Sequence, residues 1–182
     1  KNRARPAPLL LEEIGRTLQT IEQEADNFGF AVFIQSGTIL ASSQNELNGR
    51  RFSPLGQELL SAVFEGEVLV TRPFRRKSLL EGEQSGDDQP VLVAAAPIRD
   101  NQEEIIAGLL VQIDPDLDFS QILAVGNVGN TGNAFAFGQD GAVFSTTRSD
   151  AELKELGLLP DFPEATATLN IRVREPGGGL TR

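Results

Sequence analysis

Apolar and polar residues follow a helical period through the first part of the chain. The apolar positions stand three or four residues apart and are Leu10, Ile14, Leu18, Ile21 and Ala25. Polar and charged side chains occupy most of the positions between them. This spacing predicts an amphipathic helix over about residues 8–27, whose apolar face packs on the core or on a second copy of the helix.

The period then changes to that of strands. The stretch FAVFIQSGTILASS, residues 30–43, predicts a β-hairpin with a tight turn at Gly37. A near copy, NAFAFGQDGAVFSTT, spans residues 133–147 and aligns without gaps, so that Gly37 matches Gly141. The match indicates that one structural module occurs twice.

Between the two hairpins the pattern predicts one helix and three strands. Ser53 is a typical N-cap before Pro54, and the helix that follows should run to about Glu65 and stop at Gly66. Three extended segments come next: EVLVTRPF, QPVLVAAAPI and EEIIAGLLVQI. Together with the first hairpin they predict a five-stranded antiparallel sheet with helices on one face, an α+β fold.

The last third of the chain carries shorter signals. Asp114 precedes Pro115 and should cap another helix. Ser149 and Glu152 have the spacing of a capping box for a short helix that ends at Gly157. The segment TATLNIRVR, residues 166–174, predicts a final strand.

Composition excludes several classes of function. The formal net charge of −10 disfavours nucleic acid and a polybasic membrane contact, because phosphates would be repelled. The chain contains no His and no Cys, which removes the usual ligands of zinc, haem and iron–sulfur clusters and the usual catalytic base and thiol. We therefore expect a protein that is not an enzyme and that holds no metal or cofactor.

Two stretches resemble the double-Cache family of extracytoplasmic sensor domains. VLVAAAPIRDNQEEIIAGLLVQID is similar to the paired strands that close the membrane-distal module of that family. GNTGNAFAFGQDGAVFSTTR is similar to the hairpin that opens the membrane-proximal module. The resemblance implies a PAS-like five-stranded antiparallel sheet with a long N-terminal helix, followed by a partial second PAS-like module.

The resemblance also implies a domain organisation and a role. It predicts an N-terminal helix over residues 1–28, a membrane-distal module over residues 29–125 and a partial proximal module over residues 126–182. Such a fragment would be the periplasmic or extracellular ligand-sensing part of a membrane-anchored receptor, such as a histidine kinase, cyclase or chemoreceptor. It would bind a small molecule and could form a homodimer through the N-terminal helix.

The same resemblance points to a ligand site in the distal module. Many members bind amino acids through an Arg-x-Trp pair and an Asp that ends the fifth strand, and Arg72, Phe74 and Asp114 match these positions. An arginine–carboxylate fork and an ammonium–aspartate pair would suit an amino acid, and the arginine alone would suit an organic acid. Phe74 replaces the family's Trp, and the chain has no Tyr for the other aromatic positions.

Plainer roles for these residues remain open. Arg72 could be a solvated charge, and Asp114 could only cap its helix. The acidic run Asp114, Asp116 and Asp118 hints at calcium but lacks the Gly and Glu that an EF-hand loop requires. A structural or dimerisation module without a ligand, and a cytoplasmic profilin-like or roadblock-like regulatory domain, are the alternative functions.

Overall fold

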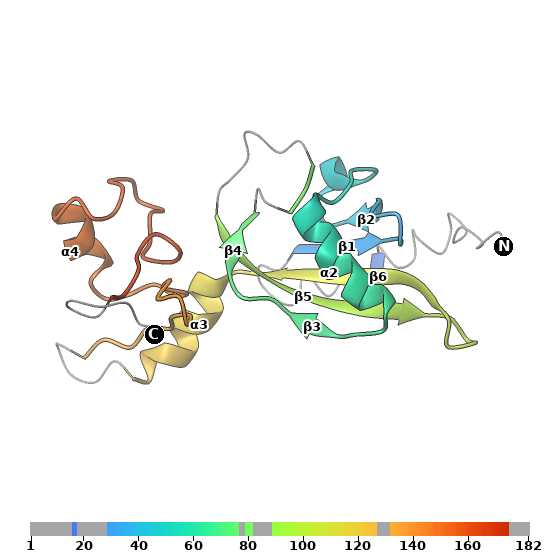
Figure 1. The fold of residues 1–182 in the computed structure, drawn as a ribbon. Coiled ribbons are helices and arrows are strands. Elements are labelled where there is room, and N and C mark those ends of the chain that lie inside the picture. The colour runs from blue at the N-terminus through green and yellow to red at the C-terminus, as the bar shows by residue number, and fades with distance from the viewer. Residues whose placement is uncertain (1–15, 18–28, 77–78, 82–88, 127–131, 175–182) are drawn as a thin grey trace. The chain divides into compact units, whose positions relative to one another are not determined.

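The computed structural model describes residues 16–17, 29–76, 79–81, 89–126 and 132–174 (Figure 1). The long N-terminal helix and the homodimer contact predicted for it fall almost entirely outside the described residues. Only Arg16 and Thr17 of that segment are described, and both are helical.

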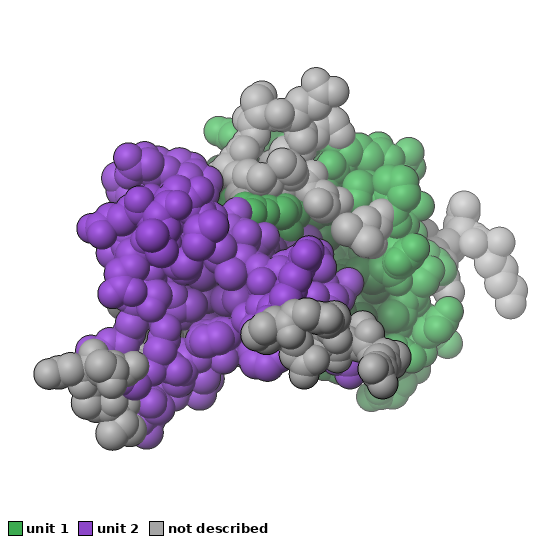
Figure 2. All heavy atoms as spheres, turned by 60° about the vertical axis from the view of Figure 1, so that its left-hand side comes forward, with its two compact units in different colours: residues 1–71, 75–113 green, residues 72–74, 114–182 purple. Residues whose placement is uncertain are grey.

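The chain divides into two compact units (Figure 2). The first unit contains residues 1–71 and 75–113, and the second contains residues 72–74 and 114–182. The first unit holds the extended sheet and the second holds the repeated hairpin. The module boundaries expected from the sequence stay a prediction.

The sheet of the first unit is antiparallel, and strands from the beginning and the end of this unit's sequence lie next to each other in it. The strands are β1 (Gly29–Phe33), β2 (Ile39–Ser42), β3 (Leu69–Val70), β4 (Phe74–Arg75), β5 (Pro90–Arg99) and β6 (Ile105–Ile113). Their order is β2-β1-β6-β5-β3, and β4 also pairs with β5. Every described pair in this order is antiparallel. The predicted PAS-like five-stranded antiparallel sheet is thus confirmed, with the short β4 in addition.

The segment EVLVTRPF is not the single strand that the sequence predicts. It forms the two-residue strands β3 and β4, with Thr71, Arg72 and Pro73 between them. Pro73 has no N–H to donate to a neighbouring strand, so the ladder is interrupted there. Thr71 keeps the edge closed: its N–H donates to the Val93 carbonyl at 2.8 Å, and its hydroxyl accepts the Val93 N–H at 3.0 Å.

Helix α2 (Pro54–Phe64) covers one face of this sheet over β5 and β6 (Figure 1). The Ser53 hydroxyl accepts the Gly56 N–H at 3.2 Å, and Pro54 occupies the first helical position. Glu65 caps the C-terminal end, and Gly66 leaves the helix with a φ of 98°. The predicted helix is confirmed because its start and stop signals are local to the sequence.

A cluster of aromatic rings fixes α2 to the sheet. The Phe33 ring meets the Phe52 ring edge to face at a centroid distance of 5.3 Å and the Phe64 ring at 6.0 Å. Phe33 and Val63 are fully buried. The chain passes from β2 to α2 through a short 3-10 helix, η1 (Asn45–Leu47).

The two hairpin turns are equivalent in detail. In the first, Gly37 has a φ of 79° and donates its N–H to the Ile34 carbonyl at 2.8 Å. In the second, Gly141 has a φ of 77° and donates to the Gly138 carbonyl at 2.8 Å. The sequence alignment therefore matches residues with the same backbone role, which supports the internal repeat.

The second unit is less regular than the sequence predicts. Its described helices are α3 (Pro115–Ala124) and α4 (Asp150–Glu155). Gly157, which follows the end of α4, has a φ of 70°. The predicted capping box of α4 is wrong, because the Ser149 side chain makes no capping hydrogen bond. Asp150, the first residue of α4, instead bonds to the residue Thr147 before the helix, accepting its N–H at 3.1 Å and its hydroxyl at 2.7 Å.

The predicted last strand is also wrong. Residues 167–170 form a turn in which Leu169 has a φ of 58°, so the segment reverses instead of extending. Its backbone still meets the second hairpin, because Leu169 donates to the Val143 carbonyl at 2.8 Å and Val143 donates to the Ile171 carbonyl at 3.0 Å. Tertiary hydrogen bonds to Val143 thus replace the continuous ladder that the alternating pattern suggested.

Candidate ligand-binding site

The three residues expected to bind a ligand follow two strands of the sheet. Arg72 lies in the break between β3 and β4, Phe74 begins β4, and Asp114 directly follows β6. All three belong to the second compact unit.

Strand register relates the chain positions of Arg72 and Asp114. Thr71 bonds to Val93 of β5, and the next residue of β5, Leu92, lies opposite Ile113 of β6. Arg72 and Asp114 therefore leave the same end of the sheet on either side of β5. Two strand spacings separate their backbones by about 10 Å.

The Arg72 side chain is exposed, and within the described part of the chain it makes no hydrogen bond or ion pair. Its neighbour Pro73 is buried, and Phe74 is half-buried. A ligand carboxylate could therefore approach the Arg72 guanidinium without displacing a bond to the described residues.

Asp114 has the capping role that its sequence position indicates. Its Oδ1 accepts the Asp116 N–H at 2.8 Å at the start of α3, and the side chain is half-buried. This bond occupies one of the two carboxylate oxygens. A carboxylate has about four acceptor positions, so the cap leaves capacity for a donor such as an ammonium group.

The second residue of the acidic run, Asp116, lies in a polar cluster of the second unit. Its carboxylate accepts hydrogen bonds from the Thr168 hydroxyl and, at 3.0 Å, from the Thr166 hydroxyl. Burial raises the pKa of Asp116 above its ordinary value of 3.8, these two hydrogen bonds lower it in part, and the charges of Asp114 and Asp150 raise it further. Thr168 is fully buried.

This cluster has the character of a structural link between α3 and the turn at residues 167–170. Within the described ranges, no group of three His, Cys, Asp or Glu side chains is arranged to hold a metal ion. The roles that the structure shows for the acidic run are the capping bond of Asp114 and the hydrogen bonds of Asp116 to the two threonines.

A groove that the sequence pattern did not indicate lies entirely within the first unit. Its volume is about 370 Å³, and its lining consists of Gln35, Ser36, Gly37, Arg51, Gln57, Leu60, Ser61, Phe64 and Glu65. One wall is the first hairpin turn and the other is a face of α2. The helical spacing of the α2 residues is visible in the sequence, but their partner wall is fixed only by the tertiary fold.

No protein-family model matches the chain, and no curated protein matches it. Among the described residues, no helix is long and apolar enough to cross a bilayer.

Solved structures of sensor domains are similar to the chain. The ligand-binding domain of the Campylobacter jejuni chemoreceptor Tlp3, in complex with 4-methylisoleucine, is 20% identical with a TM-score of 0.55, over 85% of this chain and 55% of that one. The sensor domain of the V. cholerae histidine kinase DctB is 15% identical with a TM-score of 0.51, over 81% and 57%. An extracellular ligand binding receptor from Desulfohalobium retbaense is 18% identical with a TM-score of 0.52, over 72% and 22%.

The chain thus spans a little over half of the Tlp3 and DctB domains and about a fifth of the Desulfohalobium receptor. They are, in turn, the ligand-binding domain of a chemoreceptor, the sensor domain of a histidine kinase and an extracellular ligand binding receptor. At this level of identity the similarity is one of fold. The sheet order, the covering helix and these neighbours together show that the chain has the PAS-like fold of Cache-type sensor domains.

Proposed function

We propose that the chain is the extracytoplasmic ligand-sensing domain of a transmembrane signalling receptor. It binds a small amino acid or organic acid through Arg72, Phe74 and Asp114, and it is not itself an enzyme. The observation that carries this proposal is the position of Arg72 and Asp114 at the same end of the sheet, on either side of β5, in a Cache-type fold.

The chemistry of the two side chains supports an amino acid as ligand. The exposed Arg72 guanidinium can hold a carboxylate in a two-pronged hydrogen bond, and the remaining acceptor positions of Asp114 can receive an ammonium group. Phe74 begins the strand after Arg72 and offers an apolar surface. Structures of Tlp3 contain isoleucine and L-valine, ligands with the same two charged groups.

A thermal-shift screen of amino acids and organic acids tests the proposal. A ligand that binds the folded chain raises the unfolding midpoint by mass action. Arg72→Ala should weaken the binding of a hit by about tenfold or more, because a hydrogen-bonded ion pair is lost. Asp114→Asn should weaken an amino acid in the same way while Asn still caps α3.

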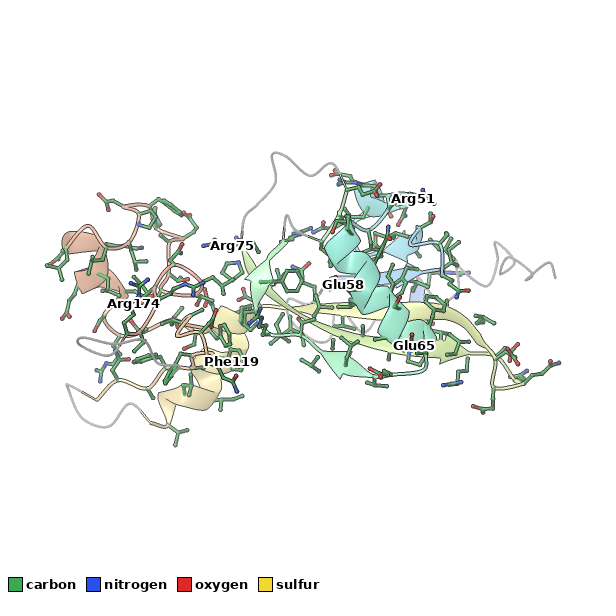
Figure 3. The ribbon with its side chains drawn as sticks, in the orientation of Figure 1. Arg51, Glu58, Glu65, Arg75, Phe119 and Arg174 are labelled. Carbon is green, nitrogen blue, oxygen red and sulfur yellow. The ribbon has the colours of Figure 1, made fainter. Side chains whose placement is uncertain are left out.

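Arg174→Ala is the matched control, because Arg174 is also an exposed arginine and lies outside the proposed site (Figure 3). Normal binding by both Arg72→Ala and Asp114→Asn would reject these residues as the site. The absence of any hit among amino acids and organic acids would instead favour a structural or dimerisation module.

A further inference from the structure

We infer that the groove between the first hairpin turn and α2 is a second binding site, which takes a short peptide with free ends. The groove lies in the first unit and contains none of the residues of the proposed amino-acid site. Its volume of about 370 Å³ lies within the usual range of small-molecule pockets, roughly 300–1,000 Å³.

One face of α2 forms the floor of this groove. The residues that line it follow the spacing of a single helical face: Gln57, Leu60, Ser61, Phe64 and Glu65. Glu65 lies eight positions after Gln57, which corresponds to about 12 Å along the helix axis at 1.5 Å per residue. An extended chain advances about 3.3–3.6 Å per residue, so the floor matches a peptide of about three residues.

The hairpin turn is held closely against this floor. Gly37 is buried, and a Cβ atom at its position would lie 3.3 Å from Leu60 Cδ1. The turn places Ser36 at the groove, where its hydroxyl shares a hydrogen bond with the Thr38 hydroxyl at 3.1 Å, and α2 places Gln57 and Ser61 there. These groups can bind the amides of an extended peptide.

Two side chains that line the groove, Arg51 and Glu65, carry opposite charges. Arg51 lies just before the N-terminal end of α2, and Glu65 lies at its C-terminal end (Figure 3). Both side chains are exposed, and neither makes a hydrogen bond or ion pair within the described part of the chain. Arg51 is therefore available to a carboxylate and Glu65 to an ammonium group.

The helix dipole adds to the same polarity. The N-terminal end of α2 carries partial positive charge and the C-terminal end partial negative charge. A bound peptide would thus place its C-terminal carboxylate at Arg51 and its N-terminal ammonium at Glu65.

The lining of the groove also includes the apolar residues Leu60 and Phe64. Leu60 is buried under the hairpin turn, so Phe64 is the apolar side chain that the groove offers to a peptide; it is half-buried, with its ring packed against the ring of Phe33. Phe64 directly precedes Glu65 at the C-terminal end of the floor, so its apolar surface lies beside the expected place of the peptide's N-terminus. An apolar side chain close to the N-terminus of the peptide should therefore contact Phe64, as the leucine of the tripeptide Ala-Leu-Ala can.

Titration calorimetry with Ala-Leu-Ala tests the inference. The unmodified chain should bind the free tripeptide, and N-acetylation or C-amidation of the peptide should each weaken binding by about tenfold or more, because each removes one charged contact. Arg51→Gln and Glu65→Gln should cause losses of the same size. Glu58→Gln is the control for Glu65→Gln, since Glu58 is an exposed carboxylate on the same helix and does not line the groove (Figure 3).

The direction of the bound peptide is tested by combining a substitution in the protein with a blocked end of the peptide. Glu65→Gln should weaken the free tripeptide but not the N-acetylated one, because acetylation has already removed the ammonium group. No binding of Ala-Leu-Ala at millimolar concentration would overturn the inference. Equal binding by the unmodified chain, Arg51→Gln and Glu65→Gln would also overturn it.

This site and the amino-acid site can fail separately. Arg51→Gln should leave an amino-acid hit in the thermal-shift screen unchanged. Arg72→Ala should leave the binding of the tripeptide unchanged. Loss of tripeptide binding in Arg72→Ala but not in Arg51→Gln would assign the peptide to the other site and reject the groove.

Discussion

The Phe33 ring occupies the space that a side chain at position 108 would need. Gly108 lies opposite Phe33 in the pairing of β1 with β6, and a Cβ atom at Gly108 would come within 2.3 Å of Phe33 Cζ. The aromatic cluster that anchors α2 therefore depends on a glycine of the neighbouring strand.

Gly108→Ala should destabilise the first unit by about 1–3 kcal/mol, because the buried Phe33 ring must shift to admit the methyl group. Urea unfolding monitored by circular dichroism would measure this change. Gly29→Ala is the matched control, since a Cβ there would meet nothing nearer than Ser43 Oγ at 3.4 Å. Equal stability of the two variants would show that the Phe33 ring does not restrict position 108.

The hydroxyl of Thr71 should be needed at the edge of the sheet. Thr71→Val has nearly the same shape but leaves the N–H of Val93, a fully buried residue, without its acceptor. We expect a loss of about 1–3 kcal/mol in the free energy of unfolding. Hydrogen exchange of the Val93 amide should become faster, whereas Thr71→Ser should retain both stability and protection. Unchanged exchange in Thr71→Val would contradict this role.

Asp116 should make stability depend on pH. Because burial raises its pKa in the folded state above the ordinary value of 3.8, protonation favours folding. Its stabilising contribution is therefore complete below about pH 4 and is lost as the pH rises through the folded-state pKa. Asp116→Asn should thus be more stable than the unmodified chain at neutral pH and nearly equal to it in acid, as measured by thermal unfolding from acid to neutral pH.

Asp116→Ala provides the contrast for that measurement. It removes the same charge but leaves the hydroxyl of fully buried Thr168 without its acceptor. We expect Asp116→Ala to be less stable than Asp116→Asn by about 1–3 kcal/mol at every pH. A pH profile of Asp116→Asn that parallels that of the unmodified chain would rule out Asp116 as the titrating group.

The two equivalent turns should respond alike to loss of glycine. Gly37→Ala and Gly141→Ala each force an alanine into a positive φ, near 79° and 77°, at a cost of about 1–2 kcal/mol. Gly37→Ala should cost more, because its Cβ also meets Leu60 at 3.3 Å. Unfolding in urea would compare the two, and Ser36→Ala, in the same turn, would serve as control. Full stability of either alanine variant would show that its turn tolerates another conformation.

Local signals in the sequence determined both ends of α2, the start of α3 and the turns of the two hairpins. Ser53 with Pro54 starts α2, Asp114 caps α3, and the glycines of the two hairpins adopt the positive φ that their turns require. Each of these features involves groups only a few residues apart, so the sequence pattern contains the whole physical cause. The resemblance to Cache sensors likewise gave the correct fold class, because it rests on such turn and strand patterns.

The tertiary structure decided which segments meet. β1 pairs with β6, about eighty residues later in the chain, and this pairing places Gly108 against Phe33. The strand predicted over residues 166–174 became a turn because its backbone bonds to Val143 and its threonines bond to Asp116. Long-range hydrogen bonds and burial outweigh the local strand preference there.

Of the two candidate sites, the sequence could indicate one, and only the tertiary structure could reveal the other. Arg72, Phe74 and Asp114 could be selected from the sequence by resemblance alone, and their role as a ligand site stays a prediction. The groove between Arg51 and Glu65 could not be selected, because its second wall is a hairpin turn about twenty residues before α2 in the chain. A binding surface made by two elements exists only after the sheet and helix have packed, and a local sequence pattern does not record that packing.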